Sequence, residues 1–362
     1  MISRRLFGLH VLGALGAALF LPHAKAATAT VSAPQRRTGD LVGEITYYVT
    51  HANETLLDIA RAHNLGVPEI SAVNPGVDPW VPGEETLLIL PTAFILPDAP
   101  REGIVINYGD LRLYYFPKNG PVQTYALGIG RDGFELKYGQ TRIVRKKEKP
   151  TWYLTESEKR DHPELGNAVP PGPDNPLGEY ALYLGWPTYL IHGTNKPYGV
   201  GRRVSRGCFR MYPEGVARLF REVQVGTKVT VLDQRVKVGW HQGELYIEVQ
   251  PDIYQIDELE ATQTMTPRPP EGDVRQHILN KAGADAARID WSIVDNELLL
   301  RRGIPVQITR PELPVVSERE PSLPMADAAS SITADNDPLD GLRARVAPPA
   351  IVRPGADRSG FY

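Results

Sequence analysis

One stretch of the sequence, residues 191–211, combines residue types that can carry out covalent chemistry. It contains the only cysteine of the chain, Cys208, and a histidine, His192, that lies upstream of it. Arginine side chains surround the cysteine, at Arg202, Arg203, Arg206 and Arg210. Positive charge favours the thiolate, which is the nucleophilic form of cysteine. A cysteine with a separate histidine as its base is the minimum that thiol acyl transfer requires, so this stretch predicts such chemistry.

The other interpretation of Cys208 is a small buried hydrophobic residue, which is the commoner role of an unpaired cysteine. Its neighbours Arg206 and Gly207 are unlike the apolar run of a core strand. The chain also has the features of an exported protein, and an unused thiol outside the cytosol is a liability. These observations favour the catalytic interpretation.

The residues around the histidine and the cysteine form a longer pattern. His192-Gly193-Thr194 is followed by a Gly/Arg-rich loop and then by Ser205-Arg206-Gly207-Cys208-Phe209-Arg210-Met211. This pattern resembles the active-site signature of the YkuD-type L,D-transpeptidases, bacterial enzymes that act on peptidoglycan through a cysteine acyl-enzyme. The resemblance implies that Cys208 is the nucleophile and that His192 is the base that ionises it. It also implies that the backbone carbonyl of Gly193 orients the imidazole.

The same resemblance implies roles for the residues beside the nucleophile. Ser205, Arg206, Gly207 and Arg210 would shape the substrate pocket, and nearby backbone N–H groups would form an oxyanion hole. Many members of the family have His and Asn where this chain has Arg206 and Phe209. This departure concerns substrate contacts rather than the chemistry.

The substrate that the resemblance implies is peptidoglycan. The enzyme would attack the meso-diaminopimelate carbonyl of a tetrapeptide stem, release D-alanine and transfer the acyl group to an amine. Clustered arginines suit a substrate that bears carboxylates. The sequence leaves the acceptor open. The amine acceptors are another stem peptide and a lysine of a lipoprotein or outer-membrane protein. If the acceptor is water, the protein is a carboxypeptidase or an enzyme that releases anchored protein. A further alternative is a peptidoglycan-binding protein without activity, against which the intact His192 and Cys208 argue.

Length and charge restrict the classes of protein to which the chain can belong. A chain of 362 residues allows two or three domains with a real core. A formal net charge of −3, with no long basic block, argues against nucleic acid as a partner. The 33 prolines and 33 glycines indicate many loops and a β-rich body rather than a helix bundle. No zinc motif such as His-Glu-x-x-His occurs, so the sequence predicts neither a metal nor another cofactor.

Residues 1–26 have the features of a signal peptide. Arg4 and Arg5 form a positive start, residues 6–21 form an apolar run, and Ala24-Lys25-Ala26 suits cleavage after Ala26. The apolar run is short for a membrane span. We therefore expect export to the periplasm by the Sec route or, because residues 3–7 resemble a twin-arginine signal, by the twin-arginine route.

Residues 27–43 are predicted to be a linker and residues 44–91 a small module. β-branched and aromatic residues predict strands at 45–49 and 87–91, and helical spacing predicts helices at 53–60, with a cap near Asn53, and at 67–74. This βααβ order, with Asn74-Pro75-Gly76 and a final Leu-Pro, resembles a LysM module. That family binds glycan such as the peptidoglycan backbone. The alternative is a small structural cap without a ligand.

After a stiff linker at residues 92–100, residues 101–233 are predicted to be the catalytic domain. Short runs of strand-forming residues alternate with turn signals, which favours an antiparallel sandwich over a parallel α/β sheet. The resemblance implies the same fold. A loop-rich segment, residues 146–176, is expected to form one wall of the substrate groove, the alternative being a plain surface excursion.

Residues 234–308 are predicted to be a small α/β accessory unit, in which residues 253–259 fit either a helix or part of a strand pair. Residues 309–362 lack any apolar period, which predicts a disordered tail. The predicted fold class is therefore α+β: a mainly antiparallel β-sandwich catalytic domain, a βααβ LysM-like module before it, and a small α/β unit and a tail after it.

Overall fold

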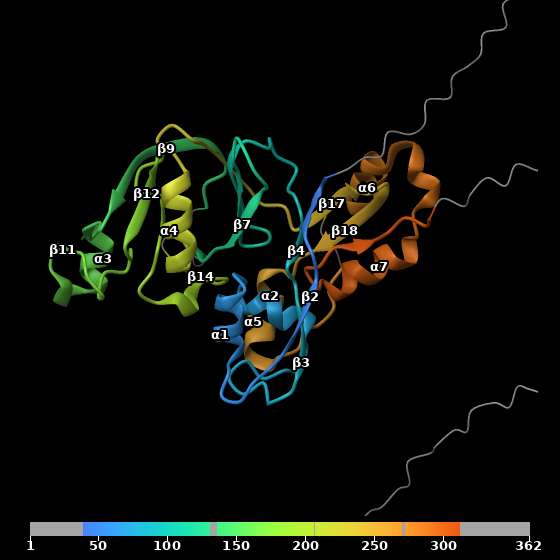
Figure 1. Cartoon of the computed structure of the whole chain (residues 1–362), viewed down its shortest axis with the longest axis horizontal. Coiled ribbons are helices and arrows are strands. Elements are labelled where there is room, and N and C mark those ends of the chain that lie inside the picture. Colours follow the sequence, from blue (N-terminus) through green and yellow to red (C-terminus); the bar gives the residue numbers. More distant parts are fainter. Residues whose placement is uncertain (1–38, 131–135, 206, 270–271, 312–362) are drawn as a thin grey trace, which may run out of the picture. The chain divides into compact units, whose positions relative to one another are not determined.

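The structure is a computed structural model that describes residues 39–130, 136–205, 207–269 and 272–311 (Figure 1). The described residues all belong to one compact unit. The predicted signal peptide and most of the predicted tail lie outside them. Within the described ranges, every helix falls short of the length and hydropathy that a bilayer-spanning segment needs.

The N-terminal part of the described chain has the predicted order of elements: β2 (Thr46–Val49), α1 (Leu56–Ala62), α2 (Val67–Val73) and β3 (Leu87–Leu90). Strands β2 and β3 pair antiparallel. Helix α1 begins later than predicted, because Asn53 has a left-handed backbone with φ of 64°. Thr55 is the cap instead, and its side chain accepts a hydrogen bond from the N–H of Asp58.

Two segments that the sequence predicts to be linkers contain a short sheet. Strand β1 (Leu41–Gly43) pairs antiparallel with strand β4 (Ala93–Ile95). Phe94 and Ile95 are 3% and 0% exposed, and the N–H of Ile95 donates to the Glu248 carboxylate. The linker prediction is therefore wrong for these residues, because pairing and burial fix both strands.

The centre of the structure is one eight-stranded sheet with the order β15-β13-β12-β9-β16-β5-β6-β7. Most neighbouring strands are antiparallel, as predicted, but β13–β15 and β5–β16 are parallel pairs. Each parallel pair joins strands that a long connection separates, which is what parallel pairing requires. The strands of this sheet and the helix that precedes β16 are β5 (Gly103–Asn107), β6 (Arg112–Phe116), β7 (Gln123–Ala126), β9 (Gly139–Glu148), β12 (Tyr180–Leu184), β13 (Leu190–His192), β15 (Phe209–Arg210), α4 (Pro213–Glu222) and β16 (Lys228–Leu232).

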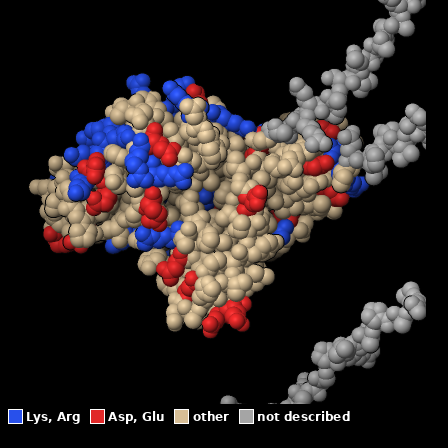
Figure 2. Space-filling view, in the orientation of Figure 1, with Lys and Arg blue, Asp and Glu red and all other residues tan. Residues whose placement is uncertain are grey.

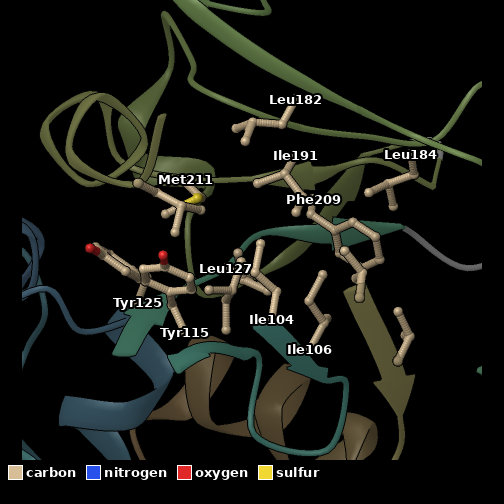
Figure 3. Packing of buried hydrophobic residues seen from close by; sticks show 14 of the residues in the cluster. Ile104, Ile106, Tyr115, Tyr125, Leu127, Leu182, Leu184, Ile191, Phe209 and Met211 are labelled. Carbon is tan, nitrogen blue, oxygen red and sulfur yellow. The ribbon is translucent and has the colours of Figure 1, made fainter. Parts of the chain in front are cut away.

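Strand β9 joins the two halves of this sheet. Its residues Gly139–Arg142 pair with β16, and its residues Ile143–Glu148 pair with β12. The two halves face each other across a shared apolar core, in which Ile191 of one half faces Ile104 of the other (Figure 3). One bent sheet therefore encloses the core.

Strand β5 is buried on both faces. Ile104 and Ile106 belong to the central core, whereas Val105 packs with the apolar residues of α1, α2 and β3. A strand that is covered on both faces does not need alternating polar and apolar residues. This explains the uninterrupted apolar run of β5. Helices α1 and α2, which we call the helical pair, are thus docked on the outer face of the sheet.

Between β9 and β12 the chain leaves the sheet in residues 149–178, which we call the wall segment. It contains β10 (Trp152–Tyr153), α3 (Glu156–Asp161) and β11 (Ala168–Val169), and β10 pairs antiparallel with β11. Asn175 is 0% exposed and closes the base of the segment by donating from Nδ2 to the carbonyls of Pro150 and Val169. The loop prediction for residues 146–176 is wrong up to Glu148, where β9 ends.

The C-terminal part adds a three-stranded sheet of β17 (Val236–His241), β18 (Glu244–Val249) and β19 (Val306–Gln307), against which α6 (Val274–Ala282) and α7 (Trp291–Leu300) pack. Residues 253–259, which the sequence left open, lie in helix α5 (Ile253–Thr262), which packs against α2. The sequence does not predict α7. Thr309 is 4% exposed and accepts a hydrogen bond from the N–H of Leu245, so the folded part extends beyond the predicted start of the tail.

Candidate active site

Strand alternation places three candidate side chains on one face of the sheet. Ile191 of β13 and Phe209 of β15 are register partners, and both are 0% exposed in the central core (Figure 3). Neighbouring residues of a strand point to opposite faces. His192, Cys208 and Arg210 therefore point away from the core, on the same side of the sheet.

His192 is held in one orientation and one tautomer. Its side chain is 4% exposed, and its Nδ1 donates a hydrogen bond of 2.6 Å to the carbonyl of Gly193. This contact leaves Nε2 as the nitrogen with a free lone pair. Burial, followed by the charge of Arg210, lowers the pKa of His192 to about 3. The imidazole is therefore neutral and can accept a proton at Nε2.

Cys208 is half-buried, and its thiol donates to the carbonyl of Thr188 at 3.3 Å. Burial raises the pKa of the Cys208 thiol to about 11, although the N–H of Leu190 and the charge of Arg210 act in the other direction. The charge of Glu158 raises it further. In the free protein desolvation outweighs the charge of Arg210, although Arg210 acts in the direction that the sequence predicts.

Two arginines of the signature, Arg202 and Arg210, have different surroundings. Arg202 forms an ion pair of 2.6 Å with Glu260. Arg206 lies outside the described residues. The charge of Arg210 reaches both His192 and Cys208, and its buried Nε has no hydrogen-bond partner within the described part of the chain. Arg210 therefore presents an unpaired donor beside the two reactive groups.

The residues just before the nucleophile are positioned by a second pair of strands. Strand β14 (Arg203–Ser205) pairs parallel with β8 (Ile129–Gly130), which places the backbone of Ser205 beside the core. Gly207 has φ of 120°, a backbone that residues with a side chain rarely adopt. A Cβ atom there would also lie 3.4 Å from the ring of Tyr189. This turn brings the chain from β14 to Cys208.

The two reactive side chains open into one cavity of about 670 Å³. Residues of the wall segment line one side of the cavity. The sequence predicts a wall at residues 146–176 but does not predict which side chains face the cavity. No sequence motif identifies these side chains, because they reach the cavity only when the long wall segment folds. The lining consists of Trp152, Glu158, His162, Glu164, Leu165, Asp174, Pro176, Leu177, His192, Asn195, Lys196, Cys208 and Arg210.

Metal ligation has no candidate among the described residues, where His, Cys, Asp and Glu side chains do not gather in groups of three or more with suitable geometry. The polar groups of the cavity instead include one thiol, one buried imidazole and side chains of both charges. This set of groups is suited to covalent acyl transfer.

Known proteins resemble this chain both in the catalytic region and over most of its length. Residues 101–231 match the family model of YkuD, the L,D-transpeptidase catalytic domain. The chain is 35% identical over 266 residues to "Probable L,D-transpeptidase ErfK/SrfK" of Escherichia coli K12, covering 72% of this chain and 84% of that protein. It is 37% identical over 286 residues to "Probable L,D-transpeptidase YcfS" of the same strain, covering 75% and 85%. Because these relatives are matched over most of their length, the chain belongs to the YkuD family of L,D-transpeptidases.

Proposed function

We propose that this L,D-transpeptidase transfers an acyl group in two steps through a thioester on Cys208. The observation that carries the proposal is the convergence of Cys208 and His192 on one face of the sheet and on one cavity. Their shifted pKa values leave both groups neutral in the free enzyme. The thiol proton therefore passes to Nε2 of His192 as the sulfur attacks, which is general-base activation of a nucleophile.

In the first step, Sγ of Cys208 bonds to the carbonyl carbon of meso-diaminopimelate in a tetrapeptide stem of peptidoglycan. The C–N bond to the terminal D-alanine breaks, and the leaving amine takes the proton from His192. In the second step an amine attacks the thioester carbon, the C–S bond breaks and the proton returns to Sγ. Backbone N–H groups near Cys208 would stabilise the negative oxygen in both steps.

Substrate contacts follow from the lining of the cavity. Arg210 and Lys196 would bind carboxylates of the stem peptide, because both are cationic and both face the cavity. Ser205, Arg206 and Gly207 would shape the approach to the nucleophile. The acceptor would be a second stem peptide or a lysine of a lipoprotein or outer-membrane protein, and water would give hydrolysis.

We also propose that residues 44–91 are a LysM-like module that binds the glycan strands of peptidoglycan. The βααβ order of its elements supports this proposal. Export to the periplasm, where peptidoglycan lies, is supported by the sequence features of residues 1–26. In this arrangement the module would hold the enzyme on its polymeric substrate.

Mass spectrometry of the mature chain with a disaccharide-tetrapeptide tests the proposal. We expect loss of D-alanine from the substrate and a thioester adduct on the protein. Cys208→Ala is the matched variant and should show neither product. Crosslinked dimers would identify a stem peptide as acceptor, and free tripeptide without dimers would indicate hydrolysis. No reaction by the parent protein would contradict the proposal and favour a binding protein without activity.

A further inference from the structure

One loop, residues 193–202, joins β13 to β14, and we call it the connecting loop. Its first part contributes Asn195 and Lys196 to the lining of the active-site cavity. Its last residue, Arg202, precedes β14, the strand just before the nucleophile. The position of this loop therefore sets the place of Lys196, one of the cationic side chains of the cavity.

The far end of the connecting loop is fixed by its contacts with the catalytic domain. Val200 is 0% exposed. The N–H of Gly201 donates a hydrogen bond to the carbonyl of Leu127 at 3.0 Å. A single turn, Pro197–Gly199, lies between this fixed end and Lys196. The place of Lys196 therefore depends on that turn.

The side chain of Arg202 contacts both this turn and a second element. Its Nη1 donates to the carbonyl of Tyr198 at 3.3 Å, and its Nε donates to Oε1 of Glu260 at 2.6 Å. Glu260 belongs to α5, which lies outside residues 101–231, the range of the catalytic-domain match. Figure 2 shows charged side chains of both signs over the visible face, so an ion pair at the surface does not by itself indicate a role. This pair differs because it connects the turn beside Lys196 to a helix of the C-terminal part.

Helix α5 is held at both ends, so it is a fixed anchor for this ion pair. At its start, Arg301, which is 6% exposed, donates to the carboxylate of Asp252 at 3.0 Å. At its end, the carbonyl of Gln263 accepts a hydrogen bond from the N–H of Gly76 at 2.9 Å. The helix also packs against α2, beside which it lies in Figure 1. The carboxylate of Glu260 is therefore presented by a rigid element.

We propose that Arg202 and Glu260 are positioning residues for substrate binding. Their ion pair holds the turn at Tyr198 and thereby places Lys196 against a carboxylate of the acyl donor. The inference rests on the proposed function, because Lys196 meets a donor only if the cavity takes up a stem peptide. Among the described residues, α5 contributes none to the lining of the cavity. The C-terminal part therefore takes part in donor recognition without touching the donor.

Loss of the ion pair should weaken donor binding without changing the thiol. Without the carboxylate of Glu260, the side chain of Arg202 can leave the carbonyl of Tyr198. Lys196 then gains conformational freedom, which donor binding must remove at a cost in affinity. Cys208 stays in place, because the adjoining strand β15 still pairs with β13. The expected result is a raised KM with an unchanged reactivity of Cys208.

A double-mutant cycle tests whether the pair acts through Lys196. The mature chain is incubated with a disaccharide-tetrapeptide over a range of concentrations, and mass spectrometry follows the release of D-alanine. We expect Glu260→Gln to raise KM about three- to tenfold and to change kcat less than about twofold. Lys196→Met should raise KM directly. Adding Glu260→Gln to Lys196→Met should raise KM no further.

Two controls separate positioning from a general loss of structure. The side chains of Arg202 and Glu260 are 25% and 32% exposed, so we expect Glu260→Gln to fold. Glu258→Gln is the matched variant, because Glu258 lies on the same helix but accepts hydrogen bonds from the backbone and the hydroxyl of Thr266 at 2.9 and 2.5 Å. It should leave KM unchanged. Alkylation of Cys208 by iodoacetamide should proceed at the parent rate in every variant.

Three results would overturn the inference: an unchanged KM in Glu260→Gln, an equal rise in Glu258→Gln, or additive effects of Glu260→Gln and Lys196→Met. Faster alkylation of Cys208 in Glu260→Gln would also overturn it, because the pair would then stabilise the surroundings of the thiol rather than position Lys196. A parent protein that releases no D-alanine overturns the proposed function, and the inference with it.

Discussion

Burial shifts the pKa values of Cys208 and His192 in opposite directions, although these two groups must exchange a proton. It raises the pKa of the thiol to about 11 and lowers the pKa of the imidazole to about 3. The cause is the same in both cases, since the charged form of each group loses its hydration. Arg210 favours the thiolate but disfavours the imidazolium. Burial in the free enzyme therefore favours the neutral thiol and the neutral imidazole over the thiolate–imidazolium pair.

The pH dependence of thiol reactivity should reveal this arrangement. Because the thiol of Cys208 has a pKa of about 11, its thiolate fraction grows throughout the neutral range as pH rises. We expect the rate constant of alkylation by iodoacetamide to increase about tenfold per pH unit between about pH 7 and about pH 10. Mass spectrometry of the intact protein measures one site, since Cys208 is the only cysteine. A plateau that begins below about pH 7 would instead reveal a preformed thiolate–imidazolium pair.

At this scale the sequence predicts the signature but not its electrostatics. The motif names His192 and Cys208, which the structure brings to one cavity, and Gly193, whose carbonyl accepts the hydrogen bond from Nδ1 of His192. The high pKa of the thiol was not predictable, since burial depends on the whole fold. The position of Glu158 and Asp174 in the lining of the cavity was not predictable either, because nothing in their local sequence distinguishes them from surface carboxylates.

Among the elements, the N-terminus of α2 and the loop before β14 approach each other closely. A Cβ atom at Gly201, which has φ of +85°, would lie 2.4 Å from Cα of Gly66. The hydroxyl of Tyr212 donates to the carbonyl of Leu65 at 2.9 Å nearby. The helical pair thus supports the loop that leads to Cys208.

Gly201→Ala should test this close approach. The left-handed backbone alone costs about 1–2 kcal/mol for a residue with a side chain. Gly226 has a similar φ of +92° but open space around it, so Gly226→Ala measures that cost without a clash. We expect Gly201→Ala to lower the free energy of unfolding by about 2 kcal/mol more than Gly226→Ala. Urea unfolding followed by circular dichroism gives both values, and equal losses would argue that the helical pair is not docked in solution.

Elements with a strong local pattern were predictable from the sequence, and short ones were not. The βααβ order of residues 46–90 and helix α4 follow from periodicity, caps and Pro213. Strands β1 and β4 have only a few residues each, and their pairing partner is distant in the chain. The parallel pairs β5–β16 and β13–β15 depend on long connections that local patterns do not encode.

Over the whole described chain, buried ion pairs connect parts that the sequence predicts as separate units. Lys237 of β17 is 0% exposed and contacts Asp110 at 2.6 Å and Glu248 at 2.7 Å. Arg112 of β6 has a side chain that is 1% exposed and contacts Glu69 of α2 at 2.8 Å. A buried charge that loses its partner is costly. These contacts therefore fix the helical pair and the C-terminal sheet to the central sheet.

Lys237→Met should destabilise the protein strongly. It leaves the carboxylates of Asp110 and Glu248 buried without a cation, which costs about 3–5 kcal/mol. The control is Lys228→Met, because Lys228 pairs with Glu102 at a site where the two side chains are 68% and 54% exposed. An exposed pair contributes less than about 1 kcal/mol. Chemical denaturation of both variants measures the difference, and similar losses would show that the buried cluster does not support the fold.

The position of β16 has a consequence for biosynthesis. This strand lies in the middle of the eight-stranded order, between β9 and β5, yet it is the last of the eight along the chain. Without β16 the strand order divides into two pieces, β5-β6-β7 and β15-β13-β12-β9. Each piece exposes an unpaired edge, the kind of surface that chaperones protect. The eight-stranded sheet that carries the active site is therefore continuous only in a chain that extends as far as Leu232.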